Sequence, residues 1–254
     1  MTEQLSPALA PAGSDLTHLA SGSTRRTIQT VCIWTGVPMI MMLMAGLVFA
    51  GFIPPPSPRA DAAETAAIYR EHTGQIRFWL AVSFLSIGFL FPFGAAIAAQ
   101  TRRLEGKTPI LTYIQIAGLA SGSLIFVIPW ICWFVAAFRP ERADSEIQLM
   151  SDLGWITFVT AFIAFSAWLV AVGVAILSDR SPTPLFPRWL GYWNIFVAVS
   201  FIPDICVPFF KSGLLCWRGI LPFYFPFGTY LAWIILMMIY TAKAIKNDPE
   251  LTDV

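Results

Sequence analysis

Asp204 is the residue of this chain whose type and position most suggest chemistry. It is the single acid of the apolar segment 189–210, WLGYWNIFVAVSFIPDICVPFF, and it lies between Pro203 and Pro208. A carboxyl group within a membrane span costs about 2.5–3.5 kcal/mol at the helix centre. A residue kept at that cost is a candidate functional group, so Asp204 is the candidate general acid and the first candidate ligand contact.

Two interpretations of Asp204 remain open on the sequence. In the structural one, the carboxyl caps a helix or pairs with a cation near the same membrane surface. The candidate cations are Arg77, Arg139, Lys211 and Arg218. In the functional one, Asp204 donates a proton or contacts a ligand, and on a regular helix it would share a face with Trp193, eleven residues earlier. Pro203 disturbs that register.

The ligand-binding candidates around Asp204 are polar and aromatic residues of the spans. Asn194 and Tyr192 precede it in the same segment, and Asn194 is either a ligand contact or a hydrogen bond between helices. Trp130, Trp133 and Trp155 come from other segments. With Trp193 they could line a pocket for a flat hydrophobic ligand such as a sterol or polyprenoid. The alternative is an aromatic belt at the water interface, as expected for Trp130 and Trp133, or bundle packing.

The other reactive residue types argue against several chemistries. Histidine occurs only at His18 and His72, too few for a membrane di-iron centre or a bis-histidine haem. No lysine lies deep in an apolar segment, which excludes a retinal Schiff base. The four cysteines have no zinc or redox spacing, although Cys206 and Cys216 are either two thiols or a disulfide. We therefore expect no cofactor and no metal.

The elements that hold these residues are predicted to be membrane helices. The chain is 57% hydrophobic and 12% charged, against about 25% charged for a soluble domain. Its apolar runs are long enough to cross about 30 Å of hydrocarbon. The predicted spans are 27–52, 78–100, 110–138, 153–177, 189–210 and 220–244. The fold class is an all-α bundle of six transmembrane spans, forming one domain over 27–245.

Local signals predict the features between and within the spans. Residues 1–26 read as a flexible cytoplasmic tail, and 246–254 as a polar one. A short helix is expected over 61–72, and another before span 4, where Ser145 and Gln148 resemble a capping box. Prolines 38 and 92 are expected to kink the first span and break the second. Gly118 and Gly122 favour close helix packing.

The basic residues favour cytoplasmic termini. Six spans place both termini on one side, where nine Lys and Arg residues fall, against seven on the other. Positive charge is enriched on the cytoplasmic side of membranes, so we expect both termini there. A net charge of +1, with no basic cluster beside stacking aromatics, argues against a nucleic-acid partner.

Three stretches carry a resemblance to known sequences. They are RPERADSEIQLMSDLGWITFV at 139–159, PRWLGYWNIFVAVSFIPDICVPFFKSG at 187–213, and the LPFYFPFGTYLAW run that follows. Together they resemble an uncharacterised family, a domain of unknown function, of six-span bacterial inner-membrane proteins. The resemblance covers about half of the chain. It implies a six-helix fold in the bacterial inner membrane, and it implies no reaction.

Three classes of function fit these features. The first is a protein that binds a hydrophobic small molecule of lipid, sterol or isoprenoid type, or a membrane-protein partner or second copy, near Asp204. The second is an integral-membrane enzyme acting on a lipid or isoprenoid with Asp204 as general acid, as in membrane terpene cyclases. The third is a proton-coupled transporter. An enzyme predicts a second polar group facing Asp204 across an enclosed cavity, whereas a transporter predicts a water path from both sides.

Overall fold

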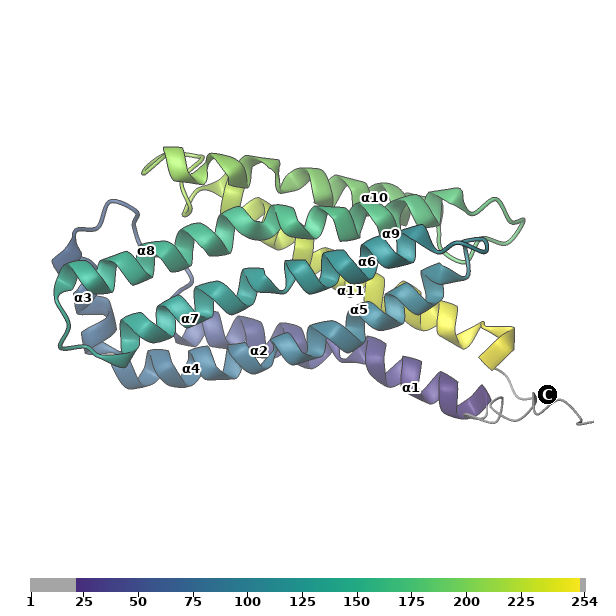
Figure 1. Cartoon of the computed structure of the whole chain (residues 1–254), viewed down its shortest axis with the longest axis horizontal. Coiled ribbons are helices and arrows are strands. Elements are labelled where there is room, and N and C mark those ends of the chain that lie inside the picture. The colour runs from purple at the N-terminus through teal and green to yellow at the C-terminus, as the bar shows by residue number, and fades with distance from the viewer. Residues whose placement is uncertain (1–21, 252–254) are drawn as a thin grey trace, which may run out of the picture.

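The computed structural model describes residues 22–251, which form a bundle of long, apolar helices (Figure 1). Six stretches are long and apolar enough to cross a membrane, as the sequence predicts, so the chain is an integral membrane protein of all-α fold. The stretches are Gly22–Phe49, Thr73–Arg102, Ile110–Phe138, Asp144–Ser178, Arg188–Phe209 and Ile220–Lys246. Of the tails predicted from the sequence, residues 1–21 and 252–254 lie outside the described residues.

Each of the first four spans changes direction or helix type near its middle. The elements are α1 (Gly22–Trp34) and α2 (Gly36–Phe49); α4 (Thr73–Leu85) and α5 (Ile87–Arg102); α6 (Ile110–Gly122) and α7 (Leu124–Phe138); and α8 (Asp144–Thr160), the 3-10 turn η1 (Ala161–Phe165) and α9 (Ser166–Ser178). A hydroxyl residue lies at each of the first three breaks: Thr35, Ser86 and Ser123.

These hydroxyl groups bond carbonyl oxygens of the preceding turn. Thr35 donates to Cys32 O at 2.6 Å, and Ser123 donates to Ala120 O at 2.7 Å. Such bonds compete with the helix ladder and bend helices in membranes. The kink predicted from Pro38 is confirmed, because its ring excludes the carbonyl of Trp34, where α1 ends. The break predicted at Pro92 is wrong: α5 continues through it, and the span breaks at Ser86 instead.

Small residues let the spans approach each other, as predicted for Gly118 and Gly122. A Cβ atom on Gly118 would lie 2.9 Å from the backbone nitrogen of Trp168, and one on Gly122 would lie 2.6 Å from the ring of Phe165. Neither space admits a methyl group without displacement. The third span therefore packs closely against η1 and α9 of the fourth.

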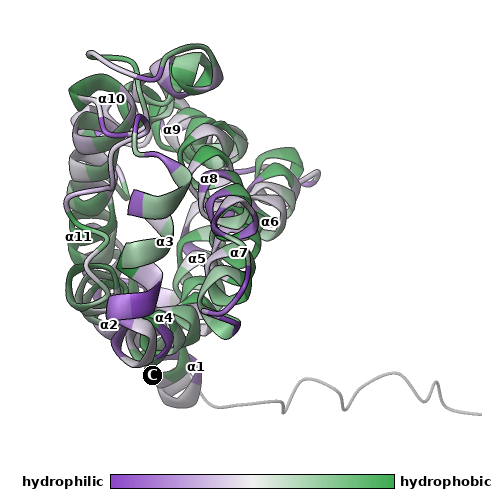
Figure 2. Ribbon diagram, turned by 90° about the vertical axis from the view of Figure 1, so that its left-hand side faces the viewer, coloured by the Kyte–Doolittle hydropathy of each residue, from purple (hydrophilic) through white to green (hydrophobic). Residues whose placement is uncertain are grey.

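The two ends of the bundle differ in what they expose. At the terminal end, α1 meets the end of the last helix, α11 (Phe225–Lys246), where Arg26 donates to Lys246 O at 2.9 Å. At the opposite end, called the loop end, the amphipathic helix α3 (Ala62–Glu71) lies across the bundle. Figure 2 looks onto this end and shows hydrophilic residues gathered on α3 and the loops, with hydrophobic helices around them.

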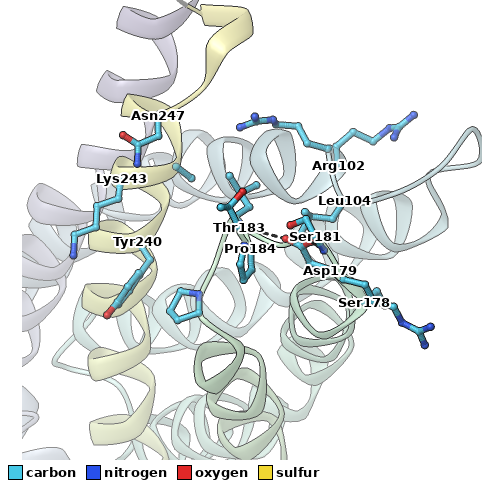
Figure 3. Close-up of a pocket in the computed structure, with 15 residues that line it drawn as sticks. Arg102, Leu104, Ser178, Asp179, Ser181, Thr183, Pro184, Tyr240, Lys243 and Asn247 are labelled. Carbon is cyan, nitrogen blue, oxygen red and sulfur yellow. Dashed lines mark hydrogen bonds between the residues drawn. The ribbon is translucent and has the colours of Figure 1, made fainter.

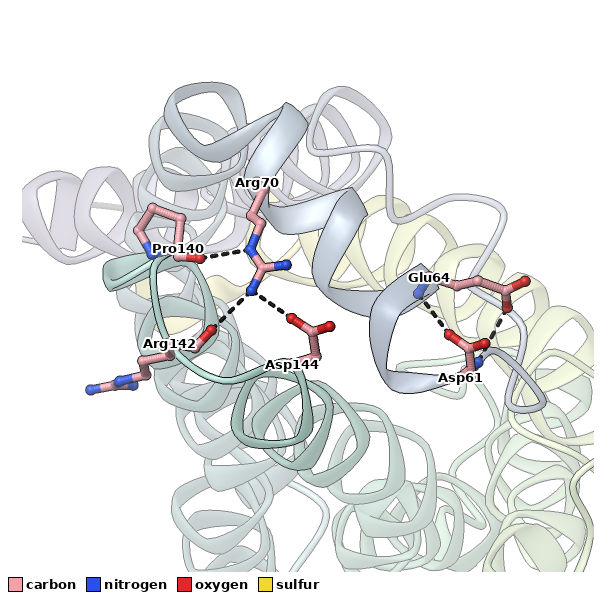
Figure 4. A network of polar contacts seen from close by, with 6 residues as sticks. All are labelled: Asp61, Glu64, Arg70, Pro140, Arg142 and Asp144. Carbon is pink, nitrogen blue, oxygen red and sulfur yellow. Dashed lines mark hydrogen bonds and ion pairs between the residues drawn. The ribbon is translucent and has the colours of Figure 1, made fainter.

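The loop end is fastened by polar contacts of α3 (Figure 4). Arg70 donates to Pro140 O at 2.8 Å and to Arg142 O at 2.9 Å, and it pairs with Asp144 at 2.6 Å. Asp61 caps α3 by accepting from Glu64 N at 2.8 Å. Tyr69 is buried beneath and donates to Ser151 Oγ at 3.2 Å, and burial raises its pKa above the usual tyrosine value.

Several helix ends differ from the sequence prediction. Residues 22–26 belong to α1 and not to a tail. The short helix predicted before span 4 is present as the first turns of α8, residues 144–152, and it continues into the span without a break. Its N-cap is Ala143 without a side-chain hydrogen bond, so Ser145 forms no capping box. The short helix predicted over 61–72 is confirmed by α3.

Candidate functional site

Asp204 lies on a 3-10 helix formed at the end of the fifth span. The α-helix α10 (Arg188–Ser200) gives way to η2 (Ile202–Phe209), in which Asp204 N donates to Phe201 O at 3.2 Å. Pro203 has no N–H to continue the α-helical ladder, which accounts for the tightening at this point. η2 packs against α8 and against η3 (Ile220–Tyr224), a π-helical turn that begins the sixth span.

The carboxyl group of Asp204 is fully buried and has no partner. Its exposed fraction is 0%, and neither oxygen accepts or donates a hydrogen bond within residues 22–251. The pairing interpretation is contradicted for Arg77, which instead donates to Ala137 O at 2.9 Å and to Phe138 O. Arg139, Lys211 and Arg218 form no ion pair with Asp204 either. A buried, unpaired carboxyl group is unusual and calls for an explanation.

A cleft at the loop end borders η2, the helix that carries Asp204. It has a volume of about 340 Å³ and is open to solvent. This loop-end cleft is lined by Pro58, Arg59, Ala60, Gln148, Asp152, Ile156, Val207, Pro208, Phe210, Lys211 and Trp217. A 3-10 helix has three residues per turn, so Asp204 lies directly beneath Val207, about 6 Å deeper along η2.

Hydrogen bonds between loops hold the rim of the loop-end cleft. Trp217 donates its indole N–H to Pro56 O at 2.9 Å, and Gln148 donates to Ala60 O at 3.0 Å. These bonds tie the loop after span 1 to the loop before span 6 and to α8. The cleft is therefore built by segments far apart in the sequence.

A second hollow follows α8 from the cleft toward the middle of the bundle. This lipid-facing groove has a volume of about 530 Å³ and lies between α8–η1 and the third span. Its lining is Ser121, Leu124, Ile125, Ile128, Ile156, Thr157, Thr160, Ala161 and Ala164. Ile156 belongs to both hollows. Along α8, the residues that line these hollows change from Gln148 and Asp152 near the loop end to Ile156 and Thr160 deeper in the span.

The predicted polar neighbours of Asp204 are used elsewhere. Asn194 is buried, donates to Leu190 O at 2.7 Å and accepts from the indole of Trp233 at 2.7 Å. The interpretation of Asn194 as a hydrogen bond between helices is confirmed. Tyr192 is 60% exposed on the outer face. Trp193 stacks on Phe196, with ring centroids 5.4 Å apart. None of these residues forms a hydrogen bond with Asp204.

The three predicted tryptophans of the other spans fill the core and line neither hollow. Trp130, Trp133 and Trp155 are all fully buried, and the rings of Trp133 and Trp155 lie 4.8 Å apart. Trp130 donates to Ser83 Oγ at 2.6 Å. The belt predicted for Trp130 and Trp133 at the water interface is therefore wrong. Both tryptophans lie toward the loop end of the third span, which suggested a water interface, but α3 and the loops cover this end of the span.

None of the residues that line the cleft or the groove is predicted as a ligand contact from the sequence. The sequence predicts Gln148 only as part of a capping box and gives Asp152 no role at this site. Cys206 and Cys216 are free thiols, and His72 has no metal-ligand cluster around it in the described part of the chain. Searches of family models, of curated proteins and of solved structures give no match to this chain.

Proposed function

We propose that this integral membrane protein binds an amphipathic, lipid-like molecule at its loop end. The polar group of the ligand enters the loop-end cleft and donates a hydrogen bond to Asp204, and its apolar chain lies in the lipid-facing groove. The observation that carries the proposal is the fully buried Asp204 carboxyl, which has no partner within residues 22–251 and belongs to the helix η2, whose Val207 and Pro208 line an open cleft. A ligand with a hydroxyl or amino group supplies the missing donor.

The shape of the two hollows supports an amphipathic ligand. The cleft is lined by Arg59, Lys211 and Asp152 as well as by Trp217, whereas the groove is almost wholly apolar. Small-molecule sites typically measure about 300–1,000 Å³ and combine apolar walls with few polar groups. Because Ile156 borders both hollows, one molecule with a small head and a chain can occupy them together.

Binding requires η2 to move, because Asp204 is fully buried and does not itself line the cleft. Short 3-10 segments often act as hinges, and η2 is followed by the exposed loop 210–215. A small outward shift of η2 uncovers Asp204 from the cleft. The proposal places the protein in the bacterial inner membrane with cytoplasmic termini, so the cleft faces outward.

The geometry favours binding over acid catalysis. An acid catalyst needs a second polar group facing it across the substrate, and Asn194, the predicted partner, is committed to Trp233. The ligand classes that fit are lipids and isoprenoid alcohols, which offer one donor at the end of a chain.

The test is native mass spectrometry of the protein purified in mild detergent, with lipid extraction of whatever is bound. We compare wild type with Asp204→Leu, and with Asp144→Asn as a control that removes a carboxyl of α8 at the same end of the bundle. Leaving the donor of the ligand unpaired in a buried site costs about 1–3 kcal/mol, or a roughly 5- to 150-fold change in affinity. We expect one discrete bound mass in wild type and in Asp144→Asn, and its loss in Asp204→Leu.

A second variant tests the groove separately. Ala164→Trp fills the groove from a position that faces lipid, so the fold is expected to tolerate it. It should remove the same bound mass while leaving Asp204 in place. The proposal is overturned if all variants keep the same bound masses, or if wild type carries none.

A further inference from the structure

A further hollow lies at the terminal end, away from Asp204. It is an open pocket of about 1170 Å³ between the α5–α6 loop, the α9–α10 loop and the end of α11 (Figure 3). This basic pocket is lined by Arg102, Arg103, Leu104, Ser178, Asp179, Arg180, Ser181, Thr183, Pro184, Leu185, Pro187, Tyr240, Lys243, Ala244 and Asn247. Figure 3 shows Tyr240 and Lys243 on one side, Thr183 and Pro184 in the middle, and Arg102 on the far side.

Positive charge in the basic pocket is not balanced by the acids around it. Arg103 pairs with Asp248 at 3.1 Å. Arg102, Arg180 and Lys243 form no ion pair with any carboxylate in the described chain. Arg102 instead donates to Glu105 O at 3.2 Å. Three cations that line the pocket thus have no carboxylate partner in the described chain.

The two acids of the flanking loops serve the backbone instead of these cations. Asp179 accepts from Ser181 N and Leu185 N, each at 2.9 Å. Partial burial of Asp179 favours its protonated form, but the hydrogen bonds from Ser181 and Leu185, with Arg188 nearby, outweigh it and lower the pKa. Glu105 accepts from Leu111 N at 2.7 Å and from Thr112 N at 2.9 Å.

The same contacts make the pocket wall rigid. Asp179 closes the α9–α10 loop on itself, prolines 182, 184 and 187 restrict it, and the buried ring of Phe186 anchors it in the core. The hydroxyl groups of Ser181 and Thr183 are on exposed residues of this loop, at the pocket. A preformed wall of cations and hydroxyl groups is suited to phosphate oxygens.

Aromatic residues place the pocket at the height of lipid headgroups. Tyr240 lines it and packs edge-to-face with Trp189, with ring centroids 5.5 Å apart. Paired, partly exposed Trp and Tyr at a span end mark the membrane–water interface. Lys243 lies over the ring of Tyr240 at 4.8 Å. Basic pockets between spans at this height bind phosphorylated lipid headgroups.

We propose that the basic pocket binds a phosphate group, with an anionic phospholipid headgroup as its source, through Arg102, Arg180 and Lys243. Leu104, Leu185 and Pro184 give the headgroup an apolar wall to lie against. This site is independent of Asp204 and of the ligand proposed at the loop end. Water-soluble phosphate offers the same chemistry, so the test includes it.

The experiment uses the full chain in nanodiscs of phosphatidylcholine with or without phosphatidylglycerol, followed by native mass spectrometry of the retained lipid. Each basic group near an anionic surface contributes about fivefold in affinity. The triple variant R102Q/R180Q/K243Q should therefore lose phosphatidylglycerol by roughly 100-fold. The control Lys107→Gln removes an exposed charge at the same end, outside the pocket, and should bind like wild type.

A second arm adds inorganic phosphate to the protein in phosphatidylcholine alone and measures thermal stabilisation. Selective retention of phosphatidylglycerol, lost only in the triple variant, supports a lipid source. Stabilisation by inorganic phosphate without lipid preference, again lost only in the triple variant, supports the phosphate site with a soluble ligand. If wild type shows neither effect, or if Lys107→Gln loses as much as the triple variant, the proposal is overturned.

Discussion

The buried carboxyl of Asp204 should make the ligand-free protein less stable than it could be. A buried polar group without a partner costs about 1–3 kcal/mol. Asp204→Leu replaces it with an apolar side chain of similar size in an apolar site between η2, α8 and η3. In protein stripped of bound lipid, we expect this variant to be more stable by about 1–3 kcal/mol. For a chain of this size that is a rise in midpoint temperature of about 2–12 °C.

The assay is thermal unfolding of the delipidated protein in one detergent, followed by tryptophan fluorescence. Asn194→Leu is the matched control, because Asn194 is equally buried but bonds Trp233 at 2.7 Å. Removing it leaves the indole N–H unpaired, so it should lower stability by about 1–3 kcal/mol. If Asp204→Leu destabilises the protein as Asn194→Leu does, then the carboxyl has a partner in the free protein, and the argument from an unpaired acid fails.

Three further predictions concern the frame that holds these sites. Gly154→Ala, which faces a buried indole of α7, should destabilise the fold by about 1–3 kcal/mol, whereas Gly228→Ala, with open space around its α carbon, should not; thermal unfolding of both tests this. Because the pKa of Asp179 is lowered in the folded protein, its carboxylate stabilises the α9–α10 loop at pH values above the unfolded aspartate pKa of about 3.9. This stabilisation is lost as the pH falls through the lower pKa of the folded state. At that low pH, hydrogen exchange of the loop amides should rise in wild type but not in Asp179→Asn. Arg70→Gln should cost about 1 kcal/mol or less from its exposed pair with Asp144, an effect that shrinks in high salt; unfolding at two salt concentrations tests it.

The number and places of the spans could be predicted because they follow from composition and length alone. Runs of apolar residues leave little choice in a bilayer, where backbone groups must bond within the helix. The breaks within the spans were harder to predict. Pro38 and Pro92 have the same chemistry, yet only the first lies at a break, because the second span bends at Ser86, where a hydroxyl bonds the preceding turn.

The candidate site was predictable only in its central residue. Asp204 stood out because a charged side chain in a span is rare whatever surrounds it. Its neighbours depended on the change to a 3-10 helix after Phe201, which alters the register that a regular helix would give Asp204 relative to Trp193. The location of a tryptophan is equally hard to predict from the sequence. Trp217 helps to form the cleft, whereas Trp130 and Trp133 lie in the core, and the residues around them in the sequence do not distinguish the two locations.

The interior between the two ends also bears on the function. Transport requires a path that opens to both sides in turn. The loop-end cleft and the basic pocket are separated by a core of stacked rings, such as Tyr230 and Trp233 with centroids 5.5 Å apart. A cavity within this core, beside Ser86 and Tyr230, has a volume of about 10 Å³, no more than one water requires. A solute would have to displace this packed core to pass, whereas a ligand bound at one end need move only η2. The arrangement therefore favours two separate binding sites, one at each membrane face, over a transport path.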